Sequence, residues 1–488
     1  MGTKFIELSK RNRTEISLSI LKVRLFFPLS LAICCLLGVL CFFFDDFFLV
    51  FFPVCIVFLI SLPLVIRTKT DVFSIWSWIF YSSILGVLIR CLYIYFDMPN
   101  FNAIDDVFLY GKAKSFLLPA MVLVFVGVFM LVLGYLSTSL NLNLNGKIFK
   151  NKKWNEKAFF ITSSLLILIS VGGLVLFINA QGGLFSMESI SSYRGVSDNL
   201  AEASPHAYLR LLVSFSGINL FLLTTWLLKY NRMRWIAYLF WLISFLTFVF
   251  FNFYISQRAA IVFTLVQLTA LSYYLKGFKL PKLKFAVGVI LALAIFQLMS
   301  TLRNVKDVEN EDVKLNITKA LEPAILTTNM IDVSKTAHIM DAIPSRMNYE
   351  YGATLVTIFI AWIPREFWPD KPVTNVDNTI GIKVFGATTY GSGGVPPGLI
   401  AELFWNFWIP GVIIGCYLIG LLIKIINQTI LSNIANPNIV IIYVVNFMFI
   451  GLSFVGSSFS SVLIGVLQTL IPMILILNII TEKGKCDI

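Results

Sequence analysis

Apolar runs of about 20 residues, the length a helix needs to cross the hydrocarbon core of a bilayer, recur along the whole chain. Short polar stretches separate them. This pattern predicts an all-α fold, that of a polytopic membrane protein with about 12 transmembrane helices. We expect these helices near residues 25–44, 47–66, 73–95, 116–136, 159–179, 209–228, 235–256, 259–275, 283–301, 398–424, 439–456 and 459–480.

One further apolar run, YGATLVTIFIAWI at residues 351–363, is shorter than the others. At about 1.5 Å of rise per residue, a helix of this length falls well short of a hydrocarbon core about 30 Å thick. We therefore predict that it is a re-entrant segment or one that lies on the membrane surface.

The placement of Lys and Arg predicts the orientation, because cytoplasmic loops are enriched in both. Stretches such as GKIFKNKKWNEK and KGFKLPKLK fall on one side if both termini are cytoplasmic and residues 351–363 do not cross. We expect three regions: residues 1–301 with nine helices and an external loop at 178–208, residues 302–397 as a large external loop holding the re-entrant segment, and residues 398–488 with three helices and a cytoplasmic tail.

Composition agrees with a membrane protein. The chain is 58% hydrophobic and 13% charged, whereas soluble domains carry about 25% charged residues. Its net charge of +12 is therefore interpreted as the positive-inside bias, and we expect no nucleic-acid partner. The cysteines, histidines and loop acids lack metal-ligand spacing, so we expect no metal site and no cofactor.

Four arginines are placed at the predicted outer rim of the membrane, against the positive-inside bias: Arg194, Arg258, Arg303 and Arg365. Each could anchor to lipid phosphates or pair with loop acids. Planar guanidinium groups also bind phosphate oxygens bidentately, so a cluster of them suits a pyrophosphate. A lipid-linked pyrophosphate is the anion expected at that depth.

The segment GSGGVPPGLIAELFWNFW places Glu402 and Asn406 on one face near the start of a helix. A carboxylate there could serve as general base toward a sugar hydroxyl, and Glu402 is our candidate catalytic residue. The alternatives are a partner for a helix dipole and a salt bridge to one of the arginines. His206 and His338, also predicted external, could transfer protons or simply be solvated.

Other residues beside these groups are candidates for substrate binding. Trp362 and Trp368 fit a membrane interface as well as stacking on sugar rings. The full set of substrate-binding candidates is Tyr193, Trp362, Trp368, Lys371 and Asn406.

Three motifs carry a resemblance to a known family: SQRAA at 256–260, WIPREFWPDKP at 362–372 and GSGGVPPGLIAELFWNFWIPGVIIG at 391–415. With the helix layout, they make the chain resemble the Wzy-type polymerases of O-antigen and other oligosaccharide repeat units. The family's loop arginines correspond here to Arg194, Arg258 and Arg365, while Arg303 is added from its position alone.

The resemblance implies a fold similar to the C-type membrane glycosyltransferases and a metal-independent glycosyl transfer. Undecaprenyl-pyrophosphate-linked oligosaccharides would be polymerised into O-antigen or capsule on the outer face of the bacterial inner membrane. Membrane lipids and a polysaccharide chain-length regulator are the further partners that it implies.

Three other functions remain open. An O-antigen ligase would share the donor and the arginines but would pass the finished chain to another acceptor. A lipid-linked oligosaccharide flippase or other transporter would carry more charges within its helices than Arg90 and Arg210. A structural scaffold for envelope assembly would leave the external arginines unexplained.

Overall fold

The computed structural model describes fifteen stretches of the chain, and the predicted helix at 283–301 lies outside them. The described residues are 26, 28–41, 43–66, 71–96, 114–137, 153–180, 207–230, 233–255, 257–279, 333–361, 363, 367–368, 370–372, 376–386 and 394–481. Within these ranges the secondary structure is helical, apart from one antiparallel bridge between Trp154 and Thr481.

Eight helices among the described residues are long and apolar enough to cross a membrane. They cover Phe48–Ile66, Ile75–Leu92, Leu117–Leu136, Glu156–Ala180, Tyr208–Lys229, Arg234–Tyr254, Leu399–Ser432 and Phe459–Ile480. Shorter apolar helices cover Pro28–Leu40, Ala259–Leu275 and Pro437–Leu452. The prediction of an all-helical multi-pass membrane protein is confirmed, and the count of about 12 stays a prediction.

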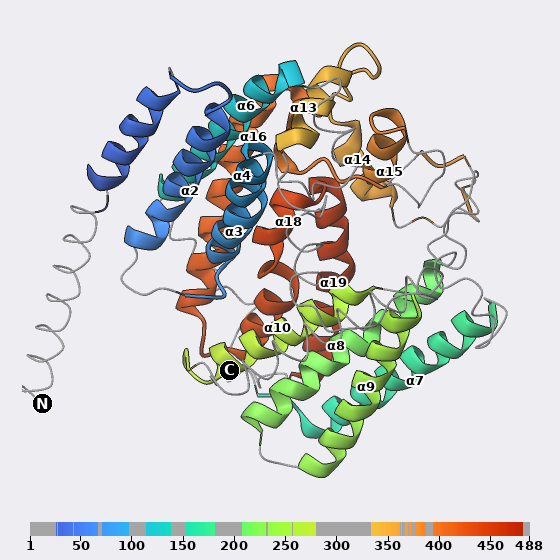
Figure 1. Ribbon diagram of the computed structural model, residues 1–488. Coiled ribbons are helices and arrows are strands. Elements are labelled where there is room, and N and C mark those ends of the chain that lie inside the picture. The colour runs from blue at the N-terminus through green and yellow to red at the C-terminus, as the bar shows by residue number, and fades with distance from the viewer. Residues whose placement is uncertain are drawn as a thin grey trace, which may run out of the picture.

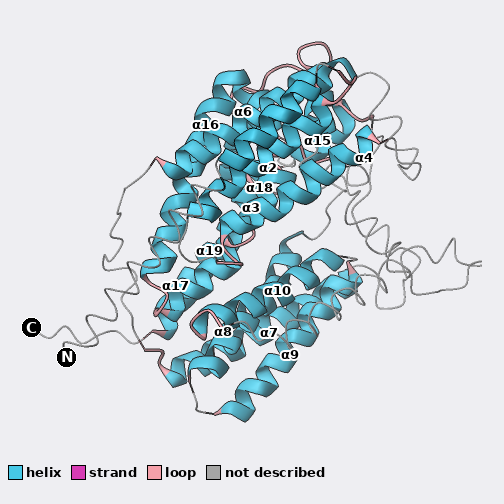
Figure 2. Cartoon of the chain, turned by 60° about the vertical axis from the view of Figure 1, so that its left-hand side comes forward, coloured by secondary structure: helices cyan, strands magenta, loops and turns pink. Residues whose placement is uncertain are grey.

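The helices form two groups (Figures 1 and 2). The first contains α2 (Phe48–Ile66), α3 (Ile75–Ser83), α6 (Leu117–Leu136), α16 (Leu399–Ser432), α18 (Ile450–Gly456) and α19 (Phe459–Ile480). The second contains α7 (Glu156–Ala180), α8 (Ala207–Lys229), α9 (Arg234–Tyr254) and α10 (Arg258–Leu275). Contacts of α7 with α19, and of α10 and α8 with α17 (Pro437–Ile442), join the groups.

Glycines set the close approach of α6 and α16. A Cβ built on Gly134 would lie 2.0 Å from the carbonyl oxygen of Tyr417, and one on Gly420 would lie 2.1 Å from that of Leu131. Because no side chain fits at either position, the two backbones pack directly together, as small residues allow between membrane helices.

The helix α16 bends sharply at Phe407 and Trp408, where the backbone leaves helical geometry (Trp408 φ 57°, ψ −153°). The bend brings Leu403 against Gly415, and Gly127 touches both Ile400 and Val412. Residues 12 positions apart in a straight helix would be separated by about 18 Å. The pattern predicts one straight helix over 398–424, but residues 399–406 instead lie alongside the start of the following helix.

Three short helices lie at one end of the first group (Figure 1). They are α13 (Val333–Ala342), α14 (Ala353–Ile360) and α15 (Val376–Lys383). The helix α14 has 8 residues and a length of about 12 Å, too short to cross a bilayer. Whether it is re-entrant stays a prediction, as do the three regions expected from the sequence.

At the other end of the long helices, the start of α7 is tied to the end of α19. Asn155 N donates to the carbonyl oxygen of Ile480 at 2.8 Å, beside the bridge between Trp154 and Thr481. The indole of Trp154 donates to Asn438 Oδ1 at 2.7 Å and stacks in a cluster that contains Trp226. The last long helix therefore holds the beginning of α7 in place.

Candidate functional site

Glu402 lies at a junction of α14, α16 and α19 and is fully buried. Its Oε1 accepts a hydrogen bond of 2.9 Å from Thr354 Oγ1, and its Oε2 accepts one from Phe459 N. Ser460 N lies 3.4 Å from both carboxylate oxygens. Both oxygens therefore receive donors from other helices.

Two of these donors, Phe459 N and Ser460 N, are the first backbone N–H groups of α19, which have no backbone acceptor within that helix. Ser458 is the N-cap of this helix, yet its side chain makes no capping bond. Its hydroxyl instead bonds Ser461 Oγ at 2.6 Å and the carboxylate of Asp377. Glu402, which is distant in the sequence, therefore caps the N-terminus of α19. The sequence does not indicate this contact with α19, and the base role stays a prediction.

Asn406, one turn after Glu402, fastens α16 to the start of α14. Its Nδ2 donates to Thr354 Oγ1 at 2.7 Å and to the carbonyl oxygen of Glu402 at 2.8 Å. Its Oδ1 accepts from Gly352 N at 3.0 Å. The predicted proximity of Glu402 and Asn406 on one face holds, and all polar atoms of this amide contact protein groups.

Lys371 lies beside the other end of α14 and is 8% exposed. Its ammonium donates to the carbonyl oxygens of Ile363 at 2.8 Å and Ala361 at 3.4 Å. A cation at the end of a helix interacts favourably with its dipole and its terminal carbonyls. Trp368, by contrast, is 38% exposed. Both were predicted to bind substrate, which stays a prediction.

A second polar cluster, which the sequence analysis missed, lies next to this junction. Lys335 on α13 is buried and its Nζ lies 3.4 Å from the carbonyl oxygen of Pro396. Burial raises the pKa of Asp377, while its hydrogen bond to Ser458 and the charge of Lys335 act in the opposite direction. The serine-rich stretch at 457–461 was a sequence signal for the start of the last helix, because Ser is typical of helix starts, but not for its contact with Asp377.

Several predicted site residues lie outside the described residues: Tyr193, Arg194, His206, Arg303, Trp362 and Arg365. Arg258 is the first residue of α10, and only its backbone is described. The predicted pyrophosphate clamp therefore stays a prediction from the sequence.

Three other basic residues named in the sequence analysis also have described positions, one histidine and two arginines. His338 on α13 is buried against the ring of Phe385, with centroids 5.3 Å apart. The guanidinium of Arg210 lies 5.6 Å from the ring centroid of Phe177, within the range of a cation–π contact. Arg90 is 3% exposed within the helix bundle. Among the described residues, no group of three His, Cys, Asp or Glu side chains is arranged to hold a metal ion.

Comparison with protein families places the chain beside a known one. The family model described as O-antigen polysaccharide polymerase Wzy matches residues 25–483, nearly the whole chain. No curated protein and no solved structure matches the chain significantly. Because this match covers almost the full length, the chain belongs to the Wzy family of O-antigen polysaccharide polymerases.

Proposed function

We propose that this protein polymerises undecaprenyl-pyrophosphate-linked oligosaccharide repeat units into a surface polysaccharide, on the outer face of the bacterial inner membrane. The observation that carries the proposal is the family match over residues 25–483. A family defined by O-antigen polymerisation acts on lipid-linked repeat units, and a membrane-embedded chain is suited to a lipid-linked donor.

The reaction is a glycosyl transfer. An oxygen of the acceptor's hydroxyl forms a bond to the anomeric carbon of the donor sugar, and the bond from that carbon to the pyrophosphate oxygen breaks. The polyprenyl pyrophosphate leaves with the electron pair, and the hydroxyl proton passes to a base. Arg194, Arg258, Arg303 and Arg365 would hold the pyrophosphate and stabilise its developing charge.

The described contacts hold the short helix α14, which precedes the arginine motif in the sequence. Asn406 and the Glu402–Thr354 pair hold the start of α14, and Lys371 binds carbonyls just beyond its end. The helix α14 is therefore held at both of its ends. The role of Arg365 in donor binding rests on its place in the motif WIPREFWPDKP, which follows α14 in the sequence.

Glu402 could act in either of two ways. As a base it would have to exchange the donors on its oxygens for a sugar hydroxyl. As a positioning residue it would keep α14 and α19 in register while another group accepts the proton. The full burial of its carboxylate favours the second role.

The test is complementation of a deletion strain, with its surface glycans separated on a gel. We expect a ladder with the intact chain and a single repeat unit without it. Arg365→Ala should collapse the ladder, while Arg234→Ala, at an exposed position on α9, should leave it intact. Long polymer still linked to undecaprenyl pyrophosphate in the deletion strain would indicate a ligase. Repeat units retained inside the cell would indicate a flippase.

A further inference from the structure

The helix α14 carries its polar and apolar side chains in the reverse of the usual order. Thr354 and Thr357 are buried, whereas Val356 and Phe359 are 56% and 80% exposed. A helix on the surface of a water-soluble protein turns its apolar stripe toward the core and its polar face outward. The exposed positions of α14 are Ala353, Val356 and Phe359, all apolar, so this face favours hydrocarbon over water.

The contacts between α6 and α16 define the depth of the bend in α16. A Cβ on Gly127 of α6 would lie 3.1 Å from the side chain of Val412. Farther along, one on Gly420 would lie 2.1 Å from the carbonyl oxygen of Leu131, so the two helices run in the same direction. The bend precedes Val412 by four residues, and α6 begins at Leu117, ten residues before Gly127. The bend therefore lies about 9 Å inside the beginning of α6, a helix long enough to cross a hydrocarbon core of about 30 Å.

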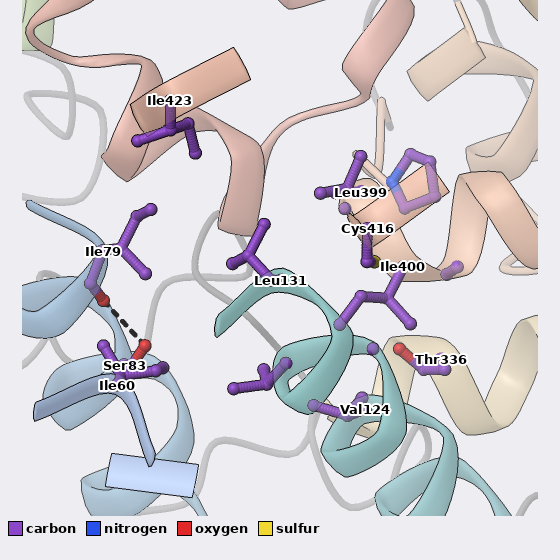
Figure 3. A pocket seen from close by; sticks show the side chains of 15 residues that line it. Ile60, Ile79, Ser83, Val124, Leu131, Thr336, Leu399, Ile400, Cys416 and Ile423 are labelled. Atoms are coloured by element: carbon purple, nitrogen blue, oxygen red, sulfur yellow. Dashed lines mark hydrogen bonds between the residues drawn. The ribbon is translucent and has the colours of Figure 1, made fainter. Parts of the chain in front are cut away.

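The segment of α16 before the bend lies deeper still. Leu399 and Ile400, at its beginning, line an apolar pocket with Val124 and Leu131 of α6 (Figure 3). Both residues of α6 belong to its middle turns. Residues 399–406 therefore run within the length of α6, from its middle toward the bend.

The start of α14 is joined to this deep segment. Thr354 Oγ1 donates to Glu402 at 2.9 Å. Glu350 N, just before α14, donates to the carbonyl oxygen of Trp405 at 3.1 Å. Because Glu402 and Trp405 precede the bend, α14 begins at about the depth of the bend or below it. The backbone pairing also suits hydrocarbon surroundings, where an unsatisfied backbone group is costly.

We propose that the acyl chains of bilayer lipids cover the outward face of α14, so that this short helix is inserted into one leaflet and does not rest on the membrane surface. A Cβ on Gly352 would lie 3.1 Å from the ring of Phe407, so this face adjoins the bend. From there the exposed face of the membrane-spanning α16 continues through Ile414 and Leu418. The inference does not depend on the proposed reaction.

The test uses the full-length protein in nanodiscs of a phosphatidylglycerol whose acyl chain carries a photoreactive diazirine. We expect Val356 and Phe359 to take label as strongly as Leu418 on the exposed face of α16. The control is Ser345, which is exposed just after α13 and bonds the carbonyl oxygen of Asp341. It should take no label. Label on Leu418 but not on α14, or equal label on Ser345, would overturn the proposal.

A face covered by a second copy of the chain would also escape the label, and native mass spectrometry would then show a dimer. Substitution gives an independent readout. Phe359→Ser should lower the melting temperature in nanodiscs by several degrees, because it places a hydroxyl among acyl chains. Phe359→Leu keeps the face apolar and should melt like the parent. A face in water would gain or lose nothing from serine, so an unchanged or higher melting temperature for Phe359→Ser would contradict the proposal.

Discussion

The carboxylate of Glu402 satisfies the first backbone N–H groups of a helix that begins 57 residues later in the chain. An N-cap side chain within α19 would usually do this, but the hydroxyl of Ser458 is used for Ser461 and Asp377. One acidic residue therefore connects three helices that share no local sequence pattern.

Glu402→Ala should strongly destabilise the protein, because it leaves the hydroxyl of Thr354 and two N–H groups of α19 without their acceptor. Each such buried group costs about 1–3 kcal/mol. Glu402→Gln keeps one acceptor oxygen and should cost less. The measurement is thermal unfolding in detergent, with Thr354→Val as a control that removes one donor and keeps the acid.

The same variants decide the chemical role of Glu402. If it is the base, Glu402→Gln should lower kcat by about 10²–10⁴-fold in folded protein, while Thr354→Val keeps most of the activity. If it is a positioning residue, the two variants should lose activity in proportion to their loss of stability. We expect the second result.

The raised pKa of Asp377 predicts that the stability of the protein depends on pH. Its pKa is raised in the folded protein by burial, so the folded state binds the proton more tightly than the unfolded state does. The free energy of unfolding should therefore fall as pH rises from the ordinary aspartate range, about 3.9, through the raised pKa. Thermal unfolding across this window should show that slope in the parent, and Asp377→Asn should remove its contribution. An unchanged slope in Asp377→Asn would contradict the assignment.

At the scale of elements, long apolar runs decide where membrane helices form. The predictions at 47–66, 116–136 and 459–480 agree closely with α2, α6 and α19, because about 20 apolar residues have few alternatives to a helix in a bilayer. The bend in α16 escaped prediction, because both of its sides are apolar. Pro410 was the available signal, since it cannot donate to the carbonyl of Asn406.

The Glu402 junction could be predicted only in part. The spacing of Glu402 and Asn406 indicates a shared face, but their partners Thr354 and Phe459 are 48 and 57 residues away from Glu402. A hydrogen bond between distant segments produces no repeating pattern of residues, so a single sequence does not reveal it. The same holds for Lys335 and Asp377.

The contact between α6 and α16 gives a prediction at this scale. Gly134→Ala would place a methyl group 2.0 Å from the backbone of Tyr417, so the two helices must separate. We expect a loss of about 1–3 kcal/mol in stability. Gly172→Ala on α7 is the matched control, because its Cβ would meet no atom within 4 Å. Equal melting temperatures for the two variants would contradict the close contact.

At the scale of the whole molecule, the loop charges predict that both termini face the cytoplasm and that residues 178–208 face outward. A fluorescent reporter that folds only in the cytoplasm should therefore be bright when fused after Ile488 and dark when inserted at residue 190. An alkaline phosphatase reporter should give the opposite result. If a reporter gave the same result at both positions, the number of membrane crossings between residue 190 and Ile488 would differ from the predicted number.

The tie between Trp154 and the end of α19 has a consequence for biogenesis. The indole N–H of Trp154 bonds to Asn438, 284 residues later. The start of α7 therefore reaches the lipid bilayer long before this acceptor is translated. During that interval the ring can already stack on Phe159, Trp226 and Tyr230, but its N–H lacks the acceptor that Asn438 supplies. A chain truncated before Asn438 would keep the stacked rings but would leave the indole N–H of Trp154 without this acceptor, so the final position of α7 is set only when the last part of the chain has been inserted.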